Sequence, residues 1–369
     1  MNPPTPLSPM DTAVIGWDVG GAHLKAARIG RDGSLSGVWL EPCPLWRGLD
    51  HLHQAIDRIE AAMPAGDPCV HAVTMTGEMV DLFETRQAGV QALAALLDQH
   101  LGGDRVRFYA ADQGWLDASQ ACQHAERVAS ANWHATAHLV STCVSEALLV
   151  DIGSTTTDLI PIRDGVVATP SSSDRERLSA GELVYTGVAR TPLMAMASEA
   201  PVAGHFTPLM AEHFATSSDV YRILGLLPEK ADLHDTADGG AKTAAASRVR
   251  LARMVGRDAA ELPDTAWTEL AAWFADAQMA RIGRAVRQVL SRGILAADAP
   301  LVIAGVGGFL GPRLAARFGR PVTNFSQILT SHAHPDMIDG CAPAVAVGRL
   351  LAAHRQLRNL HAPADTPCG

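Results

Sequence analysis

The sequence predicts a mixed α/β protein made of two similarly built halves, and three observations support this. First, the chain has 369 residues, whereas a single domain commonly holds about 150. Second, apolar runs of strand length alternate with segments of helical spacing. Third, an apolar strand ending in Asp-x-Gly, a polar turn and a second apolar strand occur together twice, beginning near Ala13 and near Glu146. A repeat so widely spaced predicts paired domains and excludes a solenoid.

Composition narrows the class of protein. Hydrophobic residues make up 47% and charged residues 19%, which predicts buried cores and argues against disorder along most of the chain. The net charge of -9 argues against a protein that coats nucleic acid. The 6 cysteines form no Cys-x-x-Cys pair, so neither a zinc ribbon nor a disulfide scaffold is expected. The first residues do not have the basic and apolar regions of a secretory signal peptide, so we expect a cytoplasmic protein. No apolar run approaches about 18 residues, so no membrane partner is expected.

The first half, residues 12–145, is expected to begin with three adjacent strands. Their apolar runs are separated by glycine-containing turns, the first of them directly after Asp18. Farther on, Leu52 and Ile56 share one face of a predicted helix. In chain order, the expected elements are strands at 12–18, 24–30 and 34–40, a helix at 49–63, a strand at 70–77, a helix at 89–101, a strand at 106–110, a helical stretch at 116–130 and a strand in the apolar run that ends at Val150.

The second half, residues 146–340, repeats the opening hairpin and then becomes less regular. A polar, turn-rich insertion is expected at about 170–265, and a long helix follows it, with Trp267 and Phe274 in its apolar set. In chain order, the expected elements are a strand at 146–153, a polar turn and a second apolar strand within 154–162, a strand at 166–170, a helix at 266–293, a strand at 300–304, a short helix at 309–319 and a terminal helix at 341–357.

The first candidate site is the turn between the first two strands, which reads DVGGAHLK from Asp18. Gly20 and Gly21 leave backbone N–H groups bare, and such groups can bind phosphate oxygens. His23 and Lys25 alternate along the strand, so both side chains leave it on one face, where Lys25 can add a positive charge. Taken alone, the pattern also fits an ordinary hairpin with glycine in its turn.

The second candidate site is the corresponding turn of the other half, from Asp151 to Asp158. Its hydroxyl groups stand beside a glycine and between two carboxylates, which suits a phosphate with its divalent cation. The alternative is a polar edge hairpin in which threonine is favoured by its β propensity. The candidate phosphate-binding residues of this turn are Gly153, Ser154, Thr155 and Thr156.

A third glycine-rich segment follows a predicted strand near the end of the second half. Gly305, Gly307 and Gly308 lie between that strand and a short helix, a position that favours close approach of a ligand. The segment is no Gly-x-Gly-x-x-Gly motif, because position 310 is Leu, and the chain contains no Walker A motif. Alone, such a strand-to-helix turn is a weak signal.

Two further polar loops are candidates for substrate contact. Thr76, Gly77 and Glu78 follow a strand, and loops at strand ends of α/β sheets commonly line a ligand crevice. Glu78 is then either a functional carboxylate or a solvated loop residue. Glu182 and Arg190 lie in the predicted insertion, where an arginine can form a bidentate contact with a phosphate or carboxylate, although a structural loop network is the alternative.

One histidine pair has the form of a metal-binding motif. His332 and His334 are separated by a single residue, but no long apolar strand precedes them and no partner pair of suitable spacing is present. A loop in the crevice is therefore a simpler interpretation than a metal site.

In order and spacing, the three glycine-containing motifs resemble those of the actin, hexokinase and heat-shock ATPase superfamily. The resemblance covers nearly the whole chain and implies two actin-like (ribonuclease H-like) domains with a central cleft. The implied domains are residues 12–145 with the terminal helix 341–357, and residues 146–340 with the insertion at about 170–265.

A narrower resemblance is carried by the segments TMTGE, VDIGSTTTDLIPI and GELVYTGVARTP. They are similar to the hydantoinase/oxoprolinase branch and, within it, to proteins of tetrahydromethanopterin-linked one-carbon metabolism. That resemblance implies a transferase that joins an (aminomethyl)furanmethyl diphosphate to the phenol oxygen of a γ-glutamyltyramine-like compound and releases diphosphate. The alternatives are an ATP-dependent small-molecule kinase, a hydantoinase-like hydrolase and a nucleotide-sensing protein without turnover.

The resemblance also implies roles for individual residues. Mg²⁺ is expected, held by the carboxylates of Asp18, Asp151 and Asp158. The implied catalytic residues are Asp18, Lys25, Asp151 and Glu78, and the candidate bases are Glu78, His23 and Glu182. The implied substrate-binding residues are Thr76, Gly77, Glu182, Arg190, Gly305, Gly307 and Gly308.

His23 stands where kinases of this superfamily commonly carry Ser or Thr, which argues against ATP phosphoryl transfer. ATP is therefore not expected to be required. Small molecules are the expected partners, and the sequence leaves a homo-oligomer open.

Overall fold

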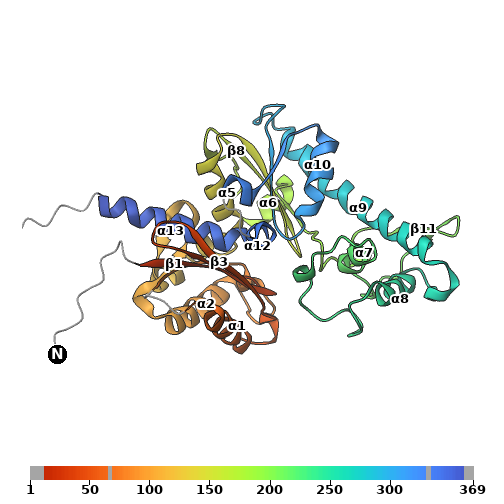
Figure 1. Ribbon diagram of the computed structural model, residues 1–369, viewed down its shortest axis with the longest axis horizontal. Helices are drawn as coiled ribbons and strands as arrows, with labels where there is room; N and C mark the ends of the chain where they lie inside the picture. The colour runs from red at the N-terminus through yellow and green to blue at the C-terminus, as the bar shows by residue number, and fades with distance from the viewer. Residues whose placement is uncertain (1–11, 65–68, 330–333, 361–369) are drawn as a thin grey trace, which may run out of the picture. The chain divides into compact units, whose positions relative to one another are not determined.

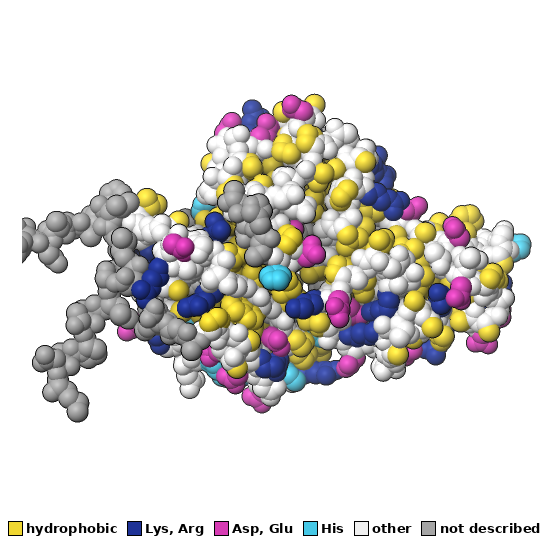
Figure 2. Space-filling model, viewed as in Figure 1, with side chains coloured by type: hydrophobic (Ala, Val, Ile, Leu, Met, Phe, Trp, Pro, Cys, Tyr) yellow, Lys and Arg dark blue, Asp and Glu magenta, His cyan; other side chains and the backbone are white. Residues whose placement is uncertain are grey.

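The computed structural model describes residues 12–64, 69–329 and 334–360 (Figure 1). The chain divides into two compact units. Unit 1 comprises residues Met1–Leu139 and Cys341–Gly369, and unit 2 comprises Val140–Gly340. Within the described ranges, no helix is long and apolar enough to cross a lipid bilayer. Figure 2 shows Lys and Arg side chains interspersed with Asp and Glu on the face in view.

Unit 1 is built on a mixed sheet with the strand order β3-β2-β1-β4-β5-β6. The first three strands form an antiparallel meander, and β4 and β5 then run parallel to β1. The strands are β1 (Ala13–Val19), β2 (His23–Ile29), β3 (Leu35–Pro42), β4 (Cys69–Met75), β5 (Val106–Tyr109) and β6 (Trp115–Leu116).

Helices cover both faces of this sheet because successive side chains of a strand point to opposite faces. Trp17 and Val19 of β1 pack with the buried residues of helices α1 and α2. On the other face, α13 packs against β1 and β2, and the backbones approach closely, since a Cβ atom on Gly16 would lie 2.0 Å from the Ala344 carbonyl oxygen. The helices are α1 (Asp50–Ala62), α2 (Arg86–Leu101), α3 (Ala118–Gln123), α4 (Ala125–Val128) and α13 (Ala342–Leu360).

Unit 2 repeats the central part of this arrangement. Its sheet has the order β10-β8-β7-β13-β14, with β9 pairing to β8. An antiparallel hairpin, β7–β8, is again followed by a strand, β13, that runs parallel to the first strand of the hairpin. The strands are β7 (Ala147–Ile152), β8 (Thr157–Arg163), β9 (Val166–Val167), β10 (Leu183–Val184), β13 (Leu301–Ala304) and β14 (Val322–Asn324).

The long helix α9 (Asp264–Leu290) is the main support of the less regular segment. Trp267 and Phe274 are fully buried in the core of unit 2, as their place in the apolar set predicted. The helix packs against α7, α8 and β11 (Figure 1). The other elements of unit 2 are α6 (Asp174–Ala180), β11 (Glu199–Val202), β12 (His205–Pro208), α7 (Ser217–Ile223), α8 (Ala244–Met254), α10 (Gly311–Phe318), α11 (Phe325–Ile328) and α12 (Pro335–Gly340).

Three local expectations need correction. Residues 132–143 form helix α5 (Asn132–Cys143), which the sequence pattern did not predict, and the strand expected in the apolar run there is confined to β7. The helical stretch expected at 116–130 is divided between α3 and α4, and a capping box formed by Asp117 and Gln120 starts it after β6. The strand expected at 166–170 is only two residues long.

Candidate functional site

A backbone hydrogen bond closes the turn between β1 and β2, and neighbouring atoms leave little room for a side chain at Gly20 and Gly21. The N–H group of Gly20 donates to the carbonyl oxygen of His23 at 3.0 Å. A Cβ atom on Gly20 would lie 2.9 Å from that oxygen, and one on Gly21 would lie 2.7 Å from Cγ1 of Val80. Contacts shorter than 3 Å require a neighbouring atom to move. A residue larger than glycine at either position would therefore displace His23 or Val80.

Asp18 and Lys25 are cross-strand neighbours at the base of the same turn. The Lys25 Nζ atom lies 3.3 Å from Oδ2 of Asp18, and the side chain of Asp18 is only 4% exposed. The other oxygen, Oδ1, is buried and accepts no hydrogen bond from any described residue. A buried carboxylate oxygen without a hydrogen bond is energetically costly, and a bound cation would remove that cost. Asp18 therefore fits the expected role of a cation ligand through Oδ1.

The end of β4 lies directly beside this turn. Thr74 is the register partner of Asp18 in the parallel pair, and the N–H group of Thr76 donates to the carbonyl oxygen of Val19 at 2.9 Å. A Cβ atom on Gly77 would lie 3.2 Å from the same Val19 oxygen. The fold thus brings together two segments that the sequence analysis treated separately, the first glycine turn and the loop after β4.

Glu78 is buried, so the interpretation as a solvated loop carboxylate is wrong. Its residue exposure is 1%, and the hydroxyl of Ser130 donates to Oε1 at 2.8 Å. Ser130 has a φ of 53°, which is uncommon outside glycine. The first turn of α2 also packs closely here, since a Cβ atom on Gly89 would lie 2.5 Å from the carbonyl oxygen of Glu78. The backbone of Glu78 is therefore held against α2, and its carboxylate is held by Ser130.

The second turn, between β7 and β8, repeats the construction in unit 2. The N–H group of Gly153 donates to the carbonyl oxygen of Thr156 at 2.8 Å, and Asp151 and Asp158 are cross-strand neighbours. Arg177, whose side chain is 2% exposed, forms an ion pair with Asp158. The charge of Asp158 is thus balanced inside the protein, and its expected role as a metal ligand stays a prediction.

The third glycine segment packs against this second turn. Gly305 has a φ of +85°, and a Cβ atom there would lie 2.2 Å from the carbonyl oxygen of Ile152 and 2.5 Å from Oδ1 of Asp151. The N–H group of Gly307 donates to the same Ile152 oxygen at 2.8 Å. Only glycine allows this backbone to lie against the Asp151 carboxylate, so the segment and the turn form one local site.

A loop from the insertion closes on the other side of the second turn. The N–H group of Val188 donates to the Gly153 oxygen at 3.0 Å, and that of Arg190 donates to the Ser154 oxygen at 2.9 Å. A Cβ atom on Gly187 would lie 2.4 Å from the backbone nitrogen of Thr155. The exposed Arg190 is thus anchored through its backbone at the turn where the sequence analysis expected phosphate.

The structure contains a supporting residue that the sequence analysis missed. Gln278 of α9 is buried, and its Nε2 atom donates to the hydroxyl of Thr186 and to the carbonyl oxygen of Gly187, both at 2.8 Å. It holds the loop that contacts the second turn. A buried glutamine in an apolar helix was the available signal, because such a side chain needs hydrogen-bond partners.

For the remaining candidate residues, the structure gives a position or a hydrogen-bond partner but does not test the predicted role. Glu182 is fully buried and accepts hydrogen bonds from Thr169 and Arg292. His23 is buried at the start of β2. His332 lies outside the described residues, and His334 lies at their edge with a φ of 51°. The roles of Glu182 and His23 as bases stay predictions.

The two groups of candidate residues belong to different units. The first turn and the loop after β4 lie in unit 1, and the second turn, the segment at 305–308 and Arg190 lie in unit 2. Each group combines a glycine-containing turn with a carboxylate, an arrangement suited to phosphate together with a cation.

Comparison with known proteins identifies the family. A model of the hydantoinase/oxoprolinase family matches residues 70–350, which include the loop after β4 and the whole of the second turn. The chain belongs to the hydantoinase/oxoprolinase family.

Two relatives in the family carry the same name, (4-{4-[2-(gamma-L-glutamylamino)ethyl]phenoxymethyl}furan-2-yl)methanamine synthase. The protein from Methanocaldococcus jannaschii is 30% identical over 255 residues, which cover 68% of this chain and 73% of that protein. The protein from Methanococcus vannielii is 37% identical over 111 residues, which cover 30% of this chain and 50% of that protein.

One solved structure supports the fold of this chain. A nucleotide-free structure of acetone carboxylase has a TM-score of 0.52 at 11% identity, covering 92% of this chain and 70% of that chain. A glucokinase of the ROK family from Streptomyces griseus has a TM-score of 0.45 at 12% identity, covering 92% of this chain and 98% of that chain. The likeness to acetone carboxylase concerns the fold alone, which is the mixed α/β actin-like ATPase fold.

Proposed function

We propose that this chain is a transferase that forms the furanmethyl aryl ether of a methanopterin-type cofactor. Its substrates would be an (aminomethyl)furanmethyl diphosphate and the phenol of a γ-glutamyltyramine-like compound. The relative from Methanocaldococcus jannaschii, named for this ether, supports the choice of reaction. The observation in the structure that carries the proposal is the buried Asp18 oxygen without a hydrogen bond, beside Lys25 and the turn that contains Gly20 and Gly21.

The diphosphate is the part of the substrate that the turns would bind. In unit 1, Gly20, Gly21, His23 and Lys25 would contact the diphosphate, and Lys25 would add a positive charge. In unit 2, Gly153, Ser154, Thr155 and Thr156 would contact it, the last three with their hydroxyls, and Arg190 is anchored at Ser154. These groups would neutralise negative charge that grows on the diphosphate as it leaves.

The residues that would hold Mg²⁺ are Asp18, through Oδ1, and Asp151, with Asp158 as a further candidate. When bound, Mg²⁺ supplies charge neutralisation at phosphate oxygens. Asp18 and Asp158 each have a counterion, Lys25 and Arg177 respectively, and the feature of Asp18 that fits a cation is its buried Oδ1, which has no hydrogen bond from a described residue.

The proposed reaction exchanges one C–O bond for another. The phenol oxygen forms a bond to the furanmethyl carbon, and the bond from that carbon to the diphosphate oxygen breaks, with its electron pair leaving on diphosphate. The phenol proton must pass to a base, since a free phenol has a pKa near about 10. Glu78 is the proposed acceptor, because its carboxylate is buried and held in place by Ser130.

The test is a reaction without nucleotide. Purified chain, Mg²⁺, the furanmethyl diphosphate and γ-glutamyltyramine are incubated, and ether and inorganic diphosphate are measured by mass spectrometry. We expect both products in equal amounts and, with ¹⁸O in the phenol, retention of the label in the ether. A Glu78→Gln variant should form the ether much more slowly while still binding diphosphate.

The alternatives give different outcomes in the same assay. A kinase would consume ATP with a furanmethyl alcohol or its monophosphate and form no ether. A hydantoinase-like hydrolase would open a cyclic amide instead. Either result, with no ether formed, would refute the transferase. The absence of nucleic acid and membrane partners and the cytoplasmic location also stay predictions.

A further inference from the structure

A cluster of metal-ligating side chains lies elsewhere in unit 1. His53, Asp57 and Glu60 follow one another on α1 at spacings of four and three residues, so they share one face of that helix. His100 lies in the last turn of α2. The candidate catalytic residues of unit 1, in contrast, lie at the end of β1, at the start of β2 and after β4.

The ligand atoms of three of these residues lie close together. The Nε2 atom of His100 lies 3.2 Å from Oδ1 of Asp57 and 4.0 Å from Oε2 of Glu60. All three ligand atoms lie within 4.8 Å of one another. Zinc bonds of about 2.0–2.2 Å in a tetrahedron separate neighbouring ligand atoms by about 3.3 Å, so small side-chain movements would complete the site.

His53 provides a second, independent indication. Its Nδ1 atom lies 3.0 Å from Nδ1 of His100, and the two rings are 5.2 Å apart. Of these two Nδ1 atoms, one must carry a proton and donate it, and the other must accept the hydrogen bond. When Nδ1 of His100 is the donor, Nε2 of the neutral His100 ring carries no proton, and its lone pair is directed at the carboxylates of Asp57 and Glu60. Metal-binding histidines almost always have their second ring nitrogen engaged in this way, which fixes both tautomer and orientation.

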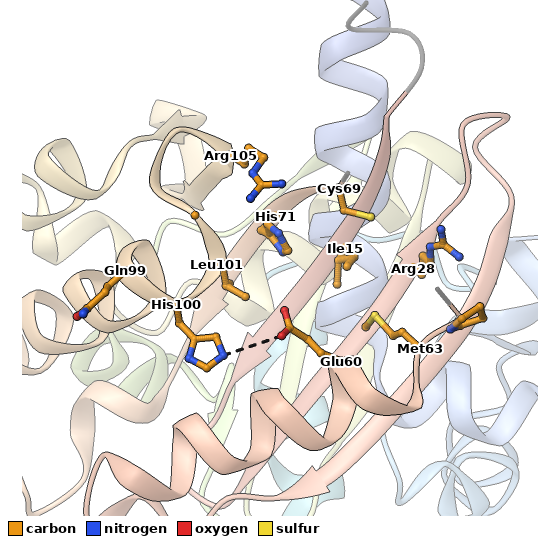
Figure 3. A pocket seen from close by; sticks show the side chains of 12 residues that line it. Ile15, Arg28, Glu60, Met63, Cys69, His71, Gln99, His100, Leu101 and Arg105 are labelled. Atoms are coloured by element: carbon orange, nitrogen blue, oxygen red, sulfur yellow. Dashed lines mark ion pairs between the residues drawn. The ribbon is translucent and has the colours of Figure 1, made fainter. Parts of the chain in front are cut away.

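The cluster also borders an open space. Glu60 and His100 contribute to the lining of a pocket of about 390 Å³, together with Arg28, His71 and Arg105. In Figure 3 the His100 ring and the Glu60 carboxylate point toward each other at one side of this pocket. The pocket leaves room for a water molecule or another ligand in a fourth coordination position, as in open zinc sites.

We propose that Asp57, Glu60 and His100 bind a divalent transition metal of the zinc class, with His53 as the hydrogen-bond partner that orients His100. One imidazole and two carboxylates suit zinc, whereas magnesium and calcium prefer oxygen ligands alone. The proposal does not depend on the proposed function, because none of these residues belongs to the phosphate turns.

The test is calorimetric titration of Zn²⁺ into the metal-free chain in the presence of excess Mg²⁺. We expect one zinc ion per chain, and a loss of affinity of at least about 100-fold in Asp57→Asn, Glu60→Gln and His100→Gln. His53→Gln should keep the stoichiometry and lower the affinity by about 10- to 100-fold. His205→Gln, which alters an exposed histidine of β12, is the matched control and should bind like the unaltered chain.

X-ray absorption of the zinc complex gives a readout that is independent of folding effects. One imidazole nitrogen with oxygen ligands at about 2.0 Å is expected, and a sulfur ligand at about 2.3 Å would assign the zinc to a cysteine instead. Asp57 is 66% exposed, so its replacement tests the site even if His100→Gln unfolds. Zinc binding unchanged in Asp57→Asn, or no zinc uptake by the unaltered chain, would refute the proposal.

Discussion

Replacement of Gly305 by alanine tests the central contact of the second site. At a φ of +85° the new side chain would be strained, at a cost of about 1–2 kcal/mol. It would also lie 2.2 Å from the backbone oxygen of Ile152, which cannot yield without moving β7, and 2.5 Å from Oδ1 of the Asp151 side chain. Such overpacking commonly costs a further 1–3 kcal/mol, about 2–5 kcal/mol in all.

Gly293→Ala is the matched control for this prediction. Gly293 has a φ of +68°, but a Cβ atom there would meet no atom within 4 Å. Its cost should therefore be the backbone strain alone, about 1–2 kcal/mol. Comparison of the two variants separates the strain from the contact with the second turn.

Thermal unfolding followed by calorimetry measures the difference. For a unit of the size of Val140–Gly340, each kcal/mol lowers Tm by about 2–4 °C, so we expect a drop of about 2–8 °C for Gly293→Ala and a clearly larger one for Gly305→Ala. Gly305→Ala should also lose transferase activity, because Asp151 is displaced, whereas the control should retain it. Equal Tm values for the two variants would contradict the packing of this segment on the second turn.

Three further predictions concern unit 1. Asp18→Asn should abolish activity while leaving the fold intact by circular dichroism; full activity, or full activity in excess chelator, would remove the cation from the mechanism. Lys25→Ala should weaken calorimetrically measured diphosphate binding by about 1–3 kcal/mol, and unchanged affinity would exclude contact with phosphate. Burial, together with Arg105, lowers the pKa of His71 to about 4 from 6.5. The unfolded chain therefore gains a proton before the folded one, and the free energy of unfolding should fall by up to about 3 kcal/mol between about pH 6.5 and 4. Chemical unfolding should show a smaller acid-dependent loss in His71→Gln than in the unaltered chain, because other groups, such as His138, also have lowered pKa values.

The sequence by itself predicted the two hairpins and the turns that join them. A continuous apolar run and a glycine turn are local features, so the positions of β1–β2 and β7–β8 could be inferred from consecutive residues. The glycine segment at 305–308 was recognised for the same reason. Helix α5 was missed because its small and apolar residues occupy a run that periodicity alone does not separate from a strand.

Only the tertiary structure decided the partners of the buried polar groups. Glu78 is held by Ser130, 52 positions away, and Thr186 by Gln278, 92 positions away. The charge of Asp158 is balanced by Arg177 from α6. A sequence pattern predicts which side chains are buried in the core, because burial follows the period of the helix or strand. The partner of a buried carboxylate or amide depends instead on which distant segment packs against it, and no local period encodes that choice.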